Sequence, residues 1–215
     1  MRRRPRLLRA LSALLLALLA GSLSRQASAA ASARDTIEQT SARVLEILRT
    51  ANLPVEEKRR RIEQIAYDTF DFDTMSKLVL ARGWRDLSPD QQHEFVGQFR
   101  TQLALTYGRR IDHYGHEELK ITGERTEPRG DVTVQSRVMG GQYDNTAIDY
   151  RLRQAGDGWK IIDVIVEGVS LVGSYRSQFQ ELLDRGGPQK VLALLREKNA
   201  AGASVDVAEP PPKTN

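Results

Sequence analysis

The hydrophobic pattern of the chain changes its period once, close to Gly115. Before this glycine, apolar residues recur at the three- to four-residue spacing of amphipathic helices, and after it they alternate with polar residues as in half-buried strands. A run of helices followed by a run of strands is typical of the α+β class. The sequence therefore predicts an antiparallel sheet of about four strands packed against several helices.

The helical half contains one strong start signal. Ser88, Pro89 and Gln91 combine a capping serine, a proline at the first helical position and a glutamine at the third, so a long helix is predicted to begin there. Apolar residues step by four along it: Phe95, Phe99, Leu103, Tyr107 and Ile111. Earlier helices are predicted over 35–48 and 55–70, with a short one around Met75.

Strands are predicted over 118–125, 131–139, 143–154 and 159–167. The last two form a hairpin, for which we predict the three-residue loop Gly156-Asp157-Gly158. A two-residue loop would place Arg151 opposite Ile162 instead of Asp163. The predicted register puts these residues on one apolar face: Ile148, Tyr150, Leu152, Ile162, Val164 and Val166. Two helices follow, separated at Gly186-Gly187-Pro188.

Residues 1–29 have the features of a secretory signal peptide. Five arginines by position 9 precede an apolar run over 10–20, and Ala27-Ser28-Ala29 offers a cleavage site. The apolar run is shorter than the ~20 residues that a membrane span needs. We therefore expect cleavage after Ala29, a single domain over 30–199 located in the periplasm, and a disordered tail over 200–215.

The positive charge of the chain is concentrated in this leader. Six of the 32 Lys and Arg residues lie in 1–29 and none of the 28 acidic ones does, so the mature net charge becomes −2. Charge therefore gives no reason to expect nucleic-acid binding. The basic run 58–61 has glutamates around it and is interpreted first as a solvated helix face, with contact to anionic head groups as the alternative.

Ser170 lies in the stretch VIVEGVSLVGSYRSQF, which resembles a nucleophile elbow in part. The elbow needs a second glycine two residues after the serine, where this chain has Val172. In that fold the histidine follows the serine, whereas all three histidines here precede it: His93, His113 and His116. The sequence thus favours Ser170 as a helix cap.

Other candidate chemistry is weak. His113 and His116 lack further ligands at helical spacing, so no metal site is predicted. Asp163 and Glu167 share a strand face with Arg151, which leaves open a small cone-shaped α+β enzyme using either carboxylate as its acid or base. Cross-strand ion pairing explains the same residues. No catalytic set is predicted.

Three segments together resemble one protein family. They are FDFDTMSKLVLARGWRDLSPDQQHEFVGQFRTQLALTY, DYRLRQAGDGWKIIDVIVEGVSLVGSYRSQF and GGPQKVLALLREK. In this order they resemble the MlaC family, also called the toluene-tolerance family, of Gram-negative periplasmic phospholipid carriers. The resemblance covers about residues 35–198.

The resemblance implies a deep apolar cavity that takes the acyl chains of a phospholipid. It also implies that the protein is not an enzyme. It implies no cofactor beyond this bound ligand. It also implies two protein partners, an outer-membrane lipoprotein and porin complex and the inner-membrane MCE-domain subunit of an ABC transporter, in a system that maintains outer-membrane lipid asymmetry. We expect a monomer. The expected lipid-binding residues are Leu103, Tyr107, Ile148, Tyr150, Leu152, Val164, Val166, Val169, Val172 and Tyr175.

Overall fold

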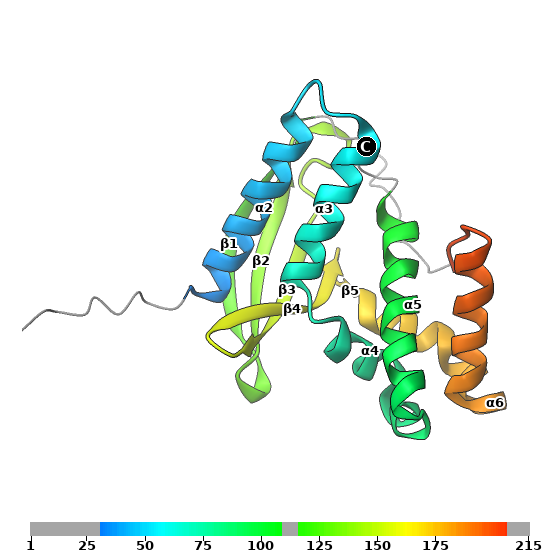
Figure 1. Ribbon diagram of the computed structural model, residues 1–215. Coiled ribbons are helices and arrows are strands. Elements are labelled where there is room, and N and C mark those ends of the chain that lie inside the picture. The colour runs from blue at the N-terminus through cyan, green and yellow to red at the C-terminus, as the bar shows by residue number, and fades with distance from the viewer. Residues whose placement is uncertain (1–30, 109–115, 206–215) are drawn as a thin grey trace, which may run out of the picture. The chain divides into compact units, whose positions relative to one another are not determined.

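The computed structural model describes residues 31–108 and 116–205 (Figure 1). The predicted signal peptide, Ile111 and His113 lie outside the described residues. None of the helices within the described ranges is long and apolar enough to cross a membrane.

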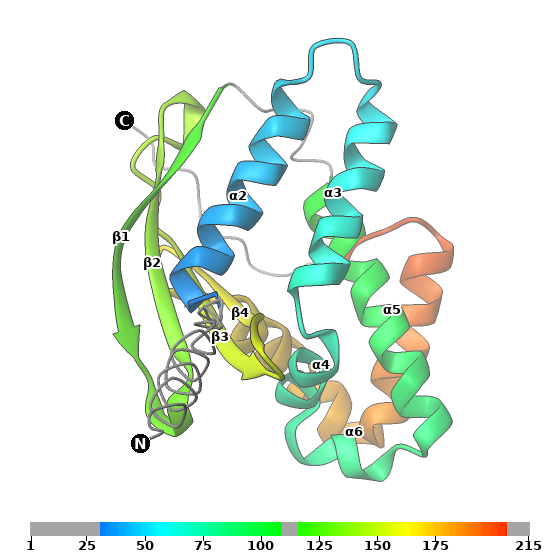
Figure 2. The ribbon, with the colours of Figure 1, turned by 60° about the vertical axis from the view of Figure 1, so that its left-hand side comes forward.

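Helices α2 (Ala33–Arg49) and α3 (Val55–Thr69) pack against each other, and α2 lies along the sheet (Figure 2). A capping box begins α2, since the Ser32 hydroxyl accepts from the Asp35 N–H while the Asp35 carboxylate accepts from the Ser32 N–H. Ala33 and Ile37 are the buried residues of α2 and anchor it on the strands.

The sheet is antiparallel with strand order β1-β2-β3-β4-β5, which confirms the predicted class. Its strands are β1 (Glu118–Thr126), β2 (Val132–Met139), β3 (Ile148–Ala155), β4 (Gly158–Val166) and β5 (Val169–Ser170). The described residues thus form five strands where about four were predicted. The additional strand is short because the chain turns at Glu167-Gly168 and pairs Val169 with Val166 before the next helix begins.

The predicted loop of the β3–β4 hairpin is wrong, although its central register is right. Ala155 pairs with Gly158, which leaves a two-residue loop whose first residue, Gly156, has a φ of 59°. A bulge at Ile162 then absorbs one residue and restores the pairing of Arg151 with Asp163. The strand predicted over 143–154 also starts later, at Ile148, because a short 3₁₀ turn occupies Gly141–Tyr143 and Asn145 follows with a φ of 61°.

The remaining helices form a separate group. They are α4 (Phe72–Leu80), the 3₁₀ turn η1 (Ala81–Asp86), α5 (Pro89–Tyr107) and α6 (Leu171–Ala200). The predicted capping box at Ser88 and Gln91 is present at the start of α5. Helix α6 is kinked at Gly186 and Gly187, and Pro188 opens its second half, as the sequence indicates.

Two hydrophobic clusters result. The sheet cluster consists of Ala33, Ile37, Val134, Leu152 and Ile161. The helical cluster consists of Met75, Val79, Leu80, Leu87, Phe95, Phe99, Val172, Tyr175, Phe179, Val191, Leu192, Leu195 and Val205. Phe70 packs against both clusters and therefore lies between them.

The chain after α6 differs from the predicted tail over its first residues. Gly202 adopts a φ of 62°, and the Ala203 N–H donates to the Lys198 carbonyl oxygen over 2.9 Å, as in a Schellman motif. Val205 is then buried in the helical cluster. Residues 206–215 lie outside the described part of the chain.

Candidate functional site

An apolar cavity of about 480 Å³ lies beside Phe70, between α3, α5 and the β3–β5 end of the sheet. This volume falls within the roughly 300–1,000 Å³ of ordinary ligand pockets. The residues that line it are Arg59, Ile62, Glu63, Ala66, Tyr67, Phe70, Phe72, Met75, Arg100, Leu103, Ala104, Tyr107, Gly108, Ile148, Tyr150, Val164, Val166, Val169, Leu171 and Ser174. The wall is therefore mostly aliphatic and aromatic, with its few charges on α3 and α5.

Strand register supplies one wall of the cavity. Ile148 pairs with Val166 and Tyr150 with Val164, and residues directly opposite in an antiparallel pair point to the same face. Small residues on the facing helices, Ala66 of α3 and Ala104 of α5, leave the space that larger side chains would fill. The cavity thus lies where these small helical residues face the wall of β3 and β4.

Seven of the ten expected lipid-binding residues line this cavity: Leu103, Tyr107, Ile148, Tyr150, Val164, Val166 and Val169. The other three, Leu152, Val172 and Tyr175, are not among its lining residues. Leu152 shares the face of Tyr150 but lies further along β3, where it packs in the sheet cluster with Ala33 and Ile37 of α2. Val172 and Tyr175 are buried in the helical cluster.

The sequence analysis missed the contribution of α3. Ile62, Ala66 and Tyr67 line the cavity from this helix, and Phe70 and Phe72 follow at its end. The signal was present in the helical spacing of Ile62, Ala66 and Phe70, which marks an apolar stripe. The stripe alone does not say whether it faces a packed core or a cavity, since both require the same side chains.

Tyr150 carries a hydroxyl into this apolar wall. Desolvation raises the pKa of Tyr150 to about 12, although the residue keeps some accessible surface. The raised pKa and the accessible surface are both explained if that surface faces the cavity rather than bulk solvent. Within the described residues, the Tyr150 hydroxyl makes no hydrogen bond.

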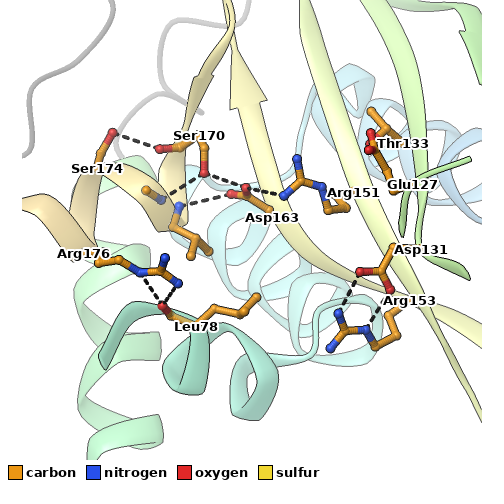
Figure 3. A network of polar contacts seen from close by, with 12 residues as sticks. Leu78, Glu127, Asp131, Thr133, Arg151, Arg153, Asp163, Ser170, Ser174 and Arg176 are labelled. Carbon is orange, nitrogen blue, oxygen red and sulfur yellow. Dashed lines mark hydrogen bonds and ion pairs between the residues drawn. The ribbon is translucent and has the colours of Figure 1, made fainter. Parts of the chain in front are cut away.

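Ser170 is the helix cap that the sequence favours. Its hydroxyl oxygen accepts from the Gly173 N–H over 2.9 Å, and the same hydroxyl donates to the Asp163 carboxylate over 2.6 Å (Figure 3). Asp163 also accepts from the Val172 N–H at 3.1 Å and pairs with Arg151 at 3.7 Å. Asp163 is 2% exposed, and its carboxylate ties β3, β4 and the start of α6 together.

The two carboxylates of the alternative enzyme hypothesis therefore have structural partners. Asp163 alternates with Val164 along β4, so it points away from the cavity wall. Glu167 has a φ of 49° in the turn before β5, and its carboxylate accepts from the Ala147 N–H over 2.6 Å. Within residues 31–108 and 116–205, no group of three or more metal-binding side chains comes together.

A second depression, of about 520 Å³, lies between α2 and β1. Its lining includes Glu46 and the ion pair between Arg49 and Glu118, whose closest atoms are 3.0 Å apart. This groove is open to solvent and charged, so it does not offer the apolar enclosure of the cavity beside Phe70.

Comparison with known proteins assigns the family. The family described as MlaC protein matches residues 38–197, about three quarters of the chain. The chain belongs to the MlaC family. This match confirms the resemblance found in the sequence.

Two individual proteins resemble this MlaC family member. The toluene tolerance protein ttg2D of Pseudomonas putida is 25% identical over 127 residues, which are 59% of this chain and 59% of that protein's own length. The phospholipid-binding protein from Ralstonia solanacearum, solved in complex with a phospholipid, aligns with a TM-score of 0.71 at 24% identity. That alignment covers 80% of this chain and 99% of the other, and it shows that the two share a fold.

Proposed function

We propose that this chain is a periplasmic carrier, not an enzyme, that binds a phospholipid by its acyl chains in the cavity beside Phe70. The observation that carries the proposal is the cavity itself, which is lined by branched aliphatic and aromatic side chains and bounded by charges on α3 and α5. Such a wall shields hydrocarbon without demanding a particular head group.

The energetics of moving a lipid through water favour this arrangement. Two acyl chains hold about 30 methylenes, and at roughly 0.8 kcal/mol each an uncovered lipid would carry a penalty above ~20 kcal/mol. A carrier must cover most of that surface. Aromatic residues such as Tyr67, Phe70 and Phe72 supply large apolar area at one end of the cavity.

Family membership extends the proposal to cellular context. With the leader predicted at 1–29, the mature chain would act as a monomer in the periplasm and carry phospholipid between the outer and inner membranes. Its partners would be the lipoprotein and porin complex at one membrane and the MCE-domain subunit of the ABC transporter at the other, in support of outer-membrane lipid asymmetry. The Ralstonia solanacearum protein of the same fold, which was solved with a phospholipid, supports the choice of ligand.

Mass spectrometry of an organic extract tests the proposal. Protein purified from the periplasm without detergent should release phospholipid in a stoichiometric amount, and N-terminal sequencing of the same sample should begin near Ala30. An extract without lipid, from protein that also takes up none when mixed with phospholipid vesicles, would contradict the proposal.

A further inference from the structure

Three charged residues among the described ones line the cavity, and two of them interact with a neighbouring side chain. Arg59 pairs with Glu56. Glu63 accepts a hydrogen bond from the Tyr67 hydroxyl. Arg100 makes no ion pair with any carboxylate in the described part of the chain, and its side chain is exposed, so it lies where the cavity opens to solvent.

The Arg100 guanidinium is nevertheless held in place. Its central carbon lies 4.3 Å from the centroid of the Tyr67 ring, in cation–π contact. Tyr67 is itself fixed by its hydrogen bond to Glu63 and by an edge-to-face contact with Phe72, whose ring centroid is 6.1 Å away. A planar guanidinium that is stacked on a ring loses little freedom when its N–H groups bind a ligand.

We propose that Arg100 binds the phosphodiester of the lipid whose acyl chains occupy the cavity, with Tyr67 setting the plane of its guanidinium. An apolar cavity with a cation at its mouth matches an amphiphile that carries an anionic group next to its hydrocarbon. Arginine N–H groups match the oxygens of a phosphate in pairs. This inference rests on the proposed function, because it needs acyl chains in the cavity.

The phosphate is shared by zwitterionic and anionic phospholipids, so Arg100 selects for the phosphate and not for one head group. It therefore distinguishes a phospholipid from diacylglycerol, which has the same two acyl chains and no phosphate. Since Arg100 is exposed, screening limits the gain, and we expect wild type to prefer the phospholipid by about three- to tenfold.

The test is a competition between these two lipids. Wild type, Arg100→Gln and Arg60→Gln are incubated with dioleoyl phosphatidylcholine vesicles that contain a minor, known fraction of dioleoylglycerol, and the bound lipids are extracted and quantified. Arg60 is the matched control because it is an exposed arginine paired with Glu57 and does not line the cavity. Wild type and Arg60→Gln should be enriched in the phospholipid, whereas Arg100→Gln should bind the two in their vesicle ratio with the total lipid unchanged.

Three results separate the possible failures. An Arg100→Gln variant that keeps the full preference overturns the role of Arg100 and leaves the carrier proposal standing, whereas wild type that binds neither lipid overturns the carrier proposal. If inorganic phosphate titrated onto the lipid-free protein binds with an affinity that depends on Arg100, the site is a phosphate site independent of lipid, and the inference is wrong.

The salt dependence of the wild-type lipid preference gives a test without any variant. A preference for the phospholipid that does not fall with ionic strength contradicts an exposed ionic contact.

Discussion

The cavity wall and the helical cluster contain the same kinds of side chain, and Val169 and Val172 show how differently the fold uses them. Val169 lines the cavity and is 44% exposed, whereas Val172, three residues later, is 5% exposed within the helical cluster. Both were expected on the cavity wall. The turn at Glu167-Gly168 separates them, because it returns Val169 to the sheet edge and lets α6 carry Val172 into the core.

The helical cluster is packed through aromatic contacts. Phe99 stacks on Phe95 with ring centroids 6.0 Å apart and meets Tyr175 edge to face at 5.1 Å. On the same helix, one turn after Phe99, Leu103 lines the cavity. Leu103 also packs against the helical cluster, so α5 buries Phe95 and Phe99 in the core and presents one side of the next turn to the cavity.

Of the substitutions that test the difference between Val169 and Val172, Val172→Glu is expected to change stability most. An unpaired carboxylate in the helical cluster should cost roughly 4 kcal/mol or more, a large share of a typical domain's stability. Val169→Glu is the matched control, and it should melt close to wild type while holding less lipid, because its carboxylate reaches solvent at the cavity. Thermal melting followed by circular dichroism measures the stability of each variant, and the phosphorus content of the purified protein measures its bound lipid. Equal melting temperatures for the two variants would show that the two valines share one environment.

A smaller effect is expected from Ser170→Ala. A helix cap alone contributes about 1 kcal/mol, but this serine also donates to a buried carboxylate, so we expect a loss of about 2–3 kcal/mol in urea unfolding. Ser88→Ala removes a cap of α5 without such a carboxylate and should cost about 1 kcal/mol. Lipid content should be unchanged in both. Loss of lipid transfer with unchanged stability would instead favour a chemical role for Ser170.

The smallest effect is expected from Tyr150→Phe, and it appears at high pH. With its pKa raised to about 12, folded Tyr150 keeps its proton where the unfolded chain, with a pKa near 10, loses it. Its contribution is therefore fully present below pH ~10 and is lost as the pH rises through about 12. The variant should match wild type at neutral pH and lose less stability across this window. Identical pH profiles in denaturant titrations would place the hydroxyl in bulk solvent.

Much of the fold follows from local signals in the sequence. The capping box at Ser88, the break at Gly186-Gly187 and the pairing of Arg151 with Asp163 depend on residues near one another or on strand parity. The bulge at Ile162 does not, because a two-residue loop with a bulge and a three-residue loop without one give the same central register. Sequence pattern cannot distinguish these two solutions.

The sequence predicted an apolar cavity but identified only part of the residues that line it. Strand parity identified Ile148, Tyr150, Val164 and Val166, which all line the cavity. Tyr175 has the same apolar character but lies in the helical cluster, because the placement of α6 against α5 depends on tertiary packing. Whether an apolar face packs against another element or lines a cavity is a property of the assembled helices and not of any one segment.

Filling the cavity tests the central claim most directly, and Ala104→Phe does so from α5. If Ala104 faces an open lipid-binding volume, the added ring fits without the roughly 1–3 kcal/mol cost of overpacking a core, and bound phospholipid falls. Ala193→Phe, at an exposed position on α6, should leave lipid unchanged. The measurement is phosphorus per protein in the purified variants, with a melting curve for each. The account predicts a folded Ala104→Phe protein that holds little phospholipid, and a folded one that holds as much as wild type would contradict it.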